Sequence, residues 1–86
     1  MTATLVELET LTAAKIVDAR GAACPGPLLE AKKGMGTVPV GSVIEIWSTD
    51  PVTKTDIAAW SAKVGHEFLG SLPADGYDRV IVRRGK

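Results

Sequence analysis

The sequence predicts an α/β (α+β) two-layer sandwich, in which two helices pack on one face of a four-stranded mixed sheet. Segments with alternating apolar and polar residues predict strands, and apolar stripes at helical spacing predict helices. These segments follow one another in the order β-α-β-α-β-β along a chain of 86 residues. Two helices that each follow a strand and pack on the same sheet face satisfy this order.

The first predicted strand is Ile16-Val17-Asp18-Ala19, which ends at Arg20-Gly21. Residues 15–86 are expected to form a single domain. Residues 1–14 are expected to form an N-terminal arm whose order stays open, because Leu5, Leu8 and Leu11 fit either an extended arm or a docked helical turn.

The first predicted helix opens at the segment Cys24-Pro25-Gly26-Pro27. Pro25 suits the first helical position, because its ring fixes φ and an amide there would have no partner within the helix. Gly34 and Gly36 are expected to stop the helix. Its apolar stripe consists of Leu28, Ala31 and Met35.

The second strand is expected over Ser42–Ser48, with Ile44 and Ile46 on one face and Val43, Glu45 and Trp47 on the other. Asp50-Pro51 is expected to open the second helix, which ends at Gly65. Its predicted core stripe is Ile57, Trp60 and Val64.

The C-terminal part of the chain predicts a β-hairpin. Glu67–Leu72 and Tyr77–Arg84 form its strands, and Pro73-Ala74-Asp75-Gly76 forms its turn. Arg79, Arg83, Arg84 and Lys86 make this region basic, either as ordinary solvated charge or as a docking edge for an acidic partner protein.

Composition narrows the class of function. Hydrophobic residues make up 45% of the chain and the formal net charge is zero, so direct nucleic-acid binding is not expected. No segment is apolar and long enough to predict a membrane span. A single cysteine cannot form an internal disulfide, and the cytoplasm is therefore the favoured location.

Cys24 is the only cysteine and the main candidate for chemistry. A thiol at the first turn of a helix faces backbone amides and the positive end of the helix dipole, which favour the nucleophilic thiolate. The alternative is a small buried apolar residue, which is the commonest role of an unpaired cysteine. From the residues alone, both interpretations stay open.

Two motifs carry a family resemblance. Asp18-Ala19-Arg20-Gly21 followed by Cys24-Pro25-Gly26-Pro27 resembles the TusA/SirA-like sulfur carrier (sulfurtransferase) family with its Cys-Pro-x-Pro motif. Asp50-Pro51-Val52-Thr53 followed by Asp56-Ile57 is similar to the start of that family's second helix. The resemblance runs from about Ile16 to the C-terminus.

The resemblance implies that Cys24 carries sulfane sulfur as a transient persulfide and passes it to a partner protein, with no bound cofactor or metal. A cysteine desulfurase or rhodanese would be the donor. The acceptor would belong to tRNA thiolation, molybdenum cofactor synthesis or sulfur oxidation. Some relatives have a second cysteine in the second helix, where this chain has Ser61. A role that needs two thiols is therefore not expected.

Around Cys24, we expect Pro25, Gly26 and Pro27 to shape the site, with the amides of Gly26 and Leu28 left as the main donors of the first turn. Arg20, Asp50 and Thr53 are candidates for docking or for supporting the site. Each also has a structural interpretation: Arg20 as a solvated loop residue, Asp50 as a helix cap, and Thr53 as a hydrogen-bonding residue within the first turn of its helix. His66 has no neighbour at metal-ligand spacing, and a metal role for it is not expected.

Trp47 is expected on the sheet face that the helices leave open. A large aromatic residue there indicates a protein contact, such as a homodimer interface, or partial cover by the N-terminal arm. The first hypothesis for the function is therefore a sulfur carrier. A non-catalytic interaction or regulatory module with a structural cysteine is the alternative, and a thiol redox protein is a weaker third hypothesis because the chain lacks a resolving cysteine.

Overall fold

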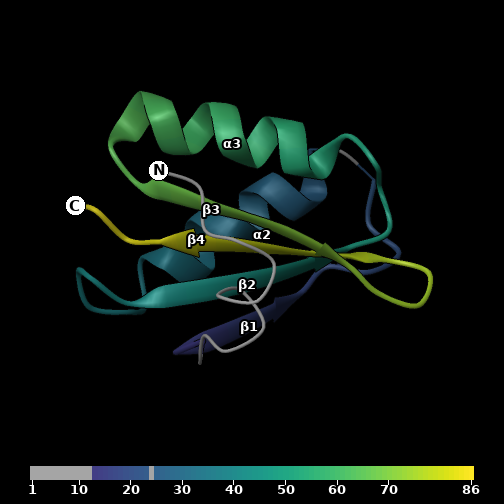
Figure 1. Cartoon of the computed structure of the whole chain (residues 1–86), viewed down its shortest axis with the longest axis horizontal. Coiled ribbons are helices and arrows are strands. Elements are labelled where there is room, and N and C mark those ends of the chain that lie inside the picture. Colours follow the sequence, from purple (N-terminus) through teal and green to yellow (C-terminus); the bar gives the residue numbers. More distant parts are fainter. Residues whose placement is uncertain (1–12, 24) are drawn as a thin grey trace.

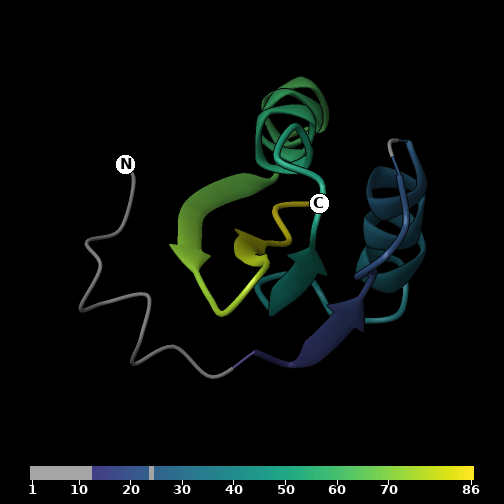
Figure 2. The ribbon, with the colours of Figure 1, turned by 90° about the vertical axis from the view of Figure 1, so that its right-hand side faces the viewer.

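A computed structural model describes residues 13–23 and 25–86. The chain runs through β1 (Lys15–Asp18), α2 (Gly26–Met35), β2 (Val43–Ser48), α3 (Thr53–Val64), β3 (Glu67–Pro73) and β4 (Asp78–Arg83). The strands form one sheet in the order β1-β2-β4-β3, in which β1 is parallel to β2 and the other pairs are antiparallel (Figure 1). Both helices lie on the same face of this sheet (Figure 2). The predicted two-layer sandwich is confirmed.

The two faces of the sheet follow the predicted alternation. In the register between β2 and β4, Ile44 lies opposite Val82, and Ile46 lies opposite Val80. These four side chains are fully buried with Ala31 and Ile57 beneath the helices. The opposite face has its own small apolar cluster, which consists of Val43, Leu69, Leu72 and Ile81.

Helix α3 differs from the prediction in its start and in its buried stripe. It begins at Thr53 rather than at Asp50-Pro51, and its fully or nearly fully buried residues are Thr53, Ile57 and Ser61. Val64, which was predicted to belong to the core, is 38% exposed. Steps of four residues keep the stripe on the face that meets the sheet. Two small polar side chains, Thr53 and Ser61, belong to it although the predicted stripe contained neither.

Helix α2 differs in the role of Gly34. The helix continues to Met35, so Gly34 does not stop it. A Cβ at position 34 would lie 2.6 Å from Cγ2 of Val17 on β1. Gly34 therefore allows α2 to pack closely against the edge strand β1. The sequence had predicted that Gly34 ends the helix, whereas its role is in packing.

Most of the basic C-terminal residues are used within the fold. Arg79 pairs with Glu45, and Arg83 pairs with Glu67 at 2.9 Å. The guanidinium of Arg84 donates to the backbone carbonyl of Met35 at 3.1 Å and so caps the end of α2. Within the described part of the chain, no helix is long and apolar enough to cross a membrane.

Candidate functional site

Three loops meet at one edge of the sheet. Because β1 and β2 are parallel, their C-terminal ends lie at the same edge, and both helices begin there. In the antiparallel register, Ser48 at the end of β2 lies opposite Asp78 at the start of β4, which brings the turn over residues 74–77 to this edge as well. The topology thus gathers the loop that contains the cysteine motif, the Asp50-Pro51 loop and the hairpin turn.

Cys24 lies outside the described residues, and its neighbours define the surroundings of the motif. Ala23 and Pro25, on either side, are exposed. Pro25 stands at the N-cap of α2, so the first helical residue is Gly26, one position later than predicted. The first turn of the helix contains no acidic residue that would oppose a nearby anion.

Pro27 and Gly26 have packing roles that the sequence did not reveal. Pro27 is fully buried at the second helical position and anchors the start of α2 in the core. The amide of Gly26 donates to the carbonyl of Ala23 at 2.7 Å, so it is not the free donor that was predicted. A Cβ at position 26 would lie only 3.2 Å from the Cβ of Ala22, and glycine therefore keeps the helix start close against the preceding loop.

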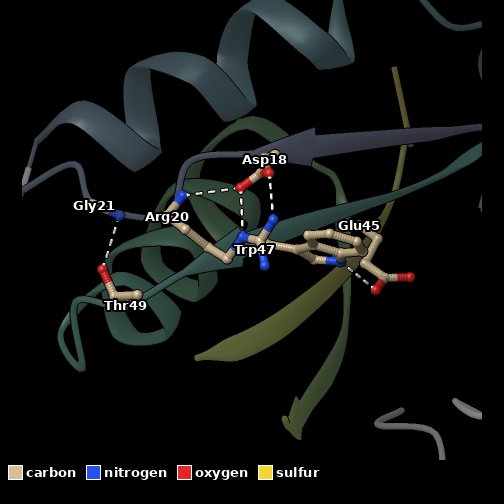
Figure 3. A network of polar contacts seen from close by, with 6 residues as sticks. All are labelled: Asp18, Arg20, Gly21, Glu45, Trp47 and Thr49. Atoms are coloured by element: carbon tan, nitrogen blue, oxygen red, sulfur yellow. Dashed lines mark hydrogen bonds and ion pairs between the residues drawn. The ribbon is translucent and has the colours of Figure 1, made fainter. Parts of the chain in front are cut away.

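The loop before the motif is attached to the end of β2 (Figure 3). The amide of Ala19 donates to the carbonyl of Trp47 at 2.9 Å. The amide of Gly21 donates to Oγ1 of Thr49 at 3.0 Å. Residues 19–21 are thus held by the neighbouring strand before the chain reaches the cysteine motif.

Arg20 is neither a free cation nor a simply solvated residue. Its guanidinium makes two hydrogen bonds to the carboxylate of Asp18, of 2.9 and 2.7 Å. It also lies over the rings of Trp47 and Tyr77, at 4.8 and 4.9 Å from their centroids. The hydrogen bonds from Arg20 lower the pKa of Asp18. Arg20 therefore joins the loop of the motif to the hairpin turn.

Trp47 continues this network onto the open face of the sheet. Its indole Nε1 donates to Oε1 of Glu45 at 2.6 Å, as Figure 3 shows. Glu45 is only 6% exposed and also accepts hydrogen bonds from Arg79. Burial acts to raise the pKa of Glu45, but the hydrogen bonds from Arg79 and Trp47 outweigh it, and the net shift is downward. Trp47 is half-buried, and its indole N–H is hydrogen-bonded.

Asp50 and Thr53 organise the second loop differently from the prediction. Val52, not Asp50, occupies the N-cap of α3, and Oδ1 of Asp50 accepts the amide of Val52 at 2.9 Å in a local turn. The hydroxyl of Thr53 is bonded to that of Ser48 at 2.7 Å, both side chains being buried. Thr53 therefore joins α3 to the end of β2 rather than bonding within its own first turn.

His66 and Ser61 have structural contacts. Nδ1 of His66 accepts the amide of Gly85 at 3.0 Å, and its ring packs edge-on against Trp60. Among the described residues, no group of three or more His, Cys, Asp or Glu side chains is arranged to hold a metal ion. Ser61 is fully buried and donates to the carbonyl of Ile57 at 2.7 Å.

Sequence reasoning missed three residues of this edge. Ser48 and Thr49 fasten two loops, and Tyr77 completes the aromatic pair beneath Arg20. A hydroxyl side chain at the end of a strand and another directly after it are the only sequence signal for the first two. Tyr77 had no such signal, because its partner Trp47 is remote in sequence and the two rings meet only through the strand register, with centroids 5.3 Å apart.

Comparison with known proteins first identifies the fold. The chain superimposes on the crystal structure of a SirA-like protein from Desulfitobacterium hafniense with a TM-score of 0.73. The match covers 84% of this chain and 99% of that one at 23% sequence identity. At this identity the likeness supports the fold alone.

Sequence comparison then identifies the family. A sequence model of the family described as Sulfurtransferase TusA matches residues 15–84, and the chain therefore belongs to the TusA family. A candidate sulfur carrier protein of Archaeoglobus fulgidus is 42% identical over 71 residues, which are 83% of this chain and 97% of the relative. The sulfur carrier protein TusA of Allochromatium vinosum is 31% identical over 68 residues, which are 79% of this chain and 90% of the relative.

Proposed function

We propose that this chain is a sulfur carrier that accepts sulfane sulfur on Cys24 as a persulfide and passes it to a partner protein. Membership of the TusA family, whose motif cysteine is Cys24 here, is the observation that carries the proposal. A sulfur carrier needs a donor protein and an acceptor protein. A cysteine desulfurase or rhodanese is the expected donor, and a reducing compartment such as the cytoplasm would keep the lone thiol available.

The chemistry is exchange at sulfur, and its atoms balance without a further reactant. The thiolate of Cys24 attacks the terminal sulfur of a donor persulfide, R–S–SH. A new S–S bond forms to give Cys24–S–SH, the donor S–S bond breaks, and the donor leaves as the thiolate R–S⁻. An acceptor thiolate then attacks the terminal sulfur and regenerates the thiolate of Cys24.

The described residues support this chemistry in two ways. The first turn of α2 has no acidic side chain, so the positive end of the helix dipole is not offset there. The loops at this edge are held by bonds from Gly21 to Thr49 and from Thr53 to Ser48. A relay between proteins benefits from a fixed surface, because each partner then meets an already ordered docking face.

The proposal predicts a mass change on one residue. After incubation with a polysulfide or with a cysteine desulfurase and cysteine, we expect the intact mass to rise by one sulfur atom and to return after treatment with a reductant. Cys24→Ser should show no gain, because it removes the only thiol of the chain.

Intact mass spectrometry with peptide mapping would check this prediction. Ser61→Ala is a suitable second variant, because it alters the position of the second cysteine of some relatives without removing the thiol, and it should still load. A chain that gains no sulfur from any donor would contradict the carrier function and would favour a non-catalytic module.

A further inference from the structure

A groove separates the exposed sides of the two helices. Near the helix starts, a hollow of about 320 Å³ is lined by Leu28, Lys32, Asp56, Ala59, Trp60 and Lys63. Towards the helix ends, a hollow of about 260 Å³ is lined by Lys32, Met35, Gly36, Trp60, Val64, His66, Arg84 and Lys86. Both hollows are lined by Lys32 of α2 and Trp60 of α3, so they adjoin, and together they are called the groove between α2 and α3.

The groove starts at the edge of the sheet where the loop of the cysteine motif, the Asp50-Pro51 loop and the hairpin turn meet. Both helices begin at that edge, and Leu28 belongs to the first turn of α2. A segment that lies in the groove would therefore reach the end of α2 that the cysteine motif enters. The floor is partly apolar, since Trp60 and Leu28 pack against the main core while remaining partly exposed.

The charge of the groove is uneven. Lys32, Lys63, Arg84 and Lys86 line it, whereas Asp56 is the one acidic side chain among its lining residues. The ion pairs within the described part of the chain include neither Lys32 nor Lys63, although Lys33, next in sequence, pairs with Glu30 on another side of α2. The chain as a whole has no net charge, so this cationic groove is a local feature.

We propose that the groove between α2 and α3 binds an extended acidic segment of a sulfur-relay partner, with carboxylates against Lys32 and Lys63 and an apolar side chain over Trp60. The proposal rests on the sulfur carrier function proposed above. It adds where and how a partner is recognised. Charge complementarity selects acidic side chains, and the partly exposed indole supplies an apolar contact of the kind that anchors protein interfaces.

The length of the groove sets the size of the segment. α2 has 10 residues, which corresponds to about 15 Å at 1.5 Å per residue. An extended peptide rises about 3.3 Å per residue, so about five residues span the groove. Side chains one, three and five of such a peptide would point towards the groove. Acidic residues at positions one and five with an apolar residue at position three would therefore place carboxylates and an apolar side chain against the groove together.

The test uses the unmodified chain labelled with ¹⁵N and the synthetic peptide Ac-Glu-Ser-Leu-Ser-Glu-NH₂ as a probe, in which both Glu side chains and the Leu side chain lie on one face of an extended backbone. The two tryptophans report on different faces, since Trp60 lines the groove and Trp47 lies beneath Arg20. We expect the indole N–H signal of Trp60 to shift on titration and that of Trp47 to stay in place. The corresponding peptide with Lys in place of both Glu residues should cause no shift.

Charge-reversal variants give a matched control. Lys32→Glu with Lys63→Glu should weaken binding of the acidic peptide by about tenfold or more, because two attractive contacts become repulsive. Lys15→Glu with Lys33→Glu changes the net charge by the same amount in a hollow on another side of α2 and should bind within about twofold of the unmodified chain. Equal weakening by both double variants would overturn the proposal, because it would show attraction to total charge only.

Failure of the groove and failure of the carrier function can be told apart. Loading of Cys24 by a small polysulfide needs no docked partner, so the Lys32/Lys63 double variant should still gain one sulfur in the mass assay. Normal loading without a Trp60 shift would overturn the groove alone. A Trp60 shift in a chain whose Cys24 accepts no sulfur would support the groove as a binding site and contradict the carrier function on which its role rests.

Discussion

Ile57→Ala is expected to lower the free energy of unfolding by about 2–5 kcal/mol. Ile57 is fully buried on α3 and belongs to the core cluster between the helices and the sheet. Truncation removes its apolar surface from the core and leaves a cavity that the surrounding side chains fill only in part. In a domain of this size each kcal/mol lowers the melting temperature by about 4–8 °C.

Thermal and urea unfolding followed by circular dichroism would measure this loss. Val64→Ala is the matched control, because Val64 lies on the same helix but is 38% exposed. It should change the unfolding free energy by no more than about 0.5 kcal/mol. Similar losses in both variants would show that the predicted stripe, which joins Ile57 to Val64, describes the buried face better than the observed stripe, which joins Ile57 to Ser61.

The different burial of Ile57 and Val64 shows which part of the fold could not be predicted from the sequence. Strand alternation predicted both faces of β2, because a period of two residues assigns each side chain to one face without further information. The buried side of α3 was harder to predict. Steps of three and four residues both fit a helix, and apolarity alone favoured Val64 over the hydroxyl of Ser61. Tertiary packing determines which side of α3 is buried.

The same distinction holds for the candidate site. The motif around Cys24 and its place before α2 could be predicted, because proline and glycine have strong positional preferences at helix starts. The partners of Arg20 and Thr53 could not. Arg20 meets Trp47 and Tyr77 only because β2 and β4 pair in one particular register, and Thr53 meets Ser48 across a loop.

At the edge of the sheet where the three loops meet, the described residues hold the helix start and the loop before the cysteine motif in place. Pro27 fixes the start of α2 in the core, while Arg20 and Thr49 fix the loop that leads to the motif. Residues around the lone cysteine therefore contribute order rather than further reactive groups. A carrier that must fit a donor and then an acceptor can use one rigid edge for both, with the identity of each partner read by adjoining surfaces such as the groove between the helices.

Glu45→Gln is expected to lower the free energy of unfolding by about 1–3 kcal/mol at neutral pH. The Glu45 carboxylate is 6% exposed and accepts hydrogen bonds from Trp47 and Arg79. Glutamine keeps the size of the side chain and one acceptor oxygen but removes the negative charge that faces Arg79. The loss should therefore come from the charge rather than from packing.

The pH dependence of this loss provides a direct check of its cause. The pKa of Glu45 lies below its ordinary value of 4.5 in the folded chain, so the unfolded chain binds the proton more readily. The stability that the charged pair contributes is present above the pKa of the unfolded chain and is lost as the pH falls through the folded pKa. Urea unfolding should accordingly show a difference between the unmodified chain and Glu45→Gln at pH 7 that shrinks in acid.

Glu67→Gln is the control for surface ion pairs in general. Glu67 pairs with Arg83 at 2.9 Å, but both side chains are 42% exposed, and a solvated pair of this kind is worth less than about 1 kcal/mol. A loss in Glu45→Gln no greater than that in Glu67→Gln, or one that does not change between pH 7 and acid, would mean that the buried carboxylate does not stabilise the open face of the sheet. The larger and pH-dependent loss is expected because burial leaves less water to screen the Glu45–Arg79 pair.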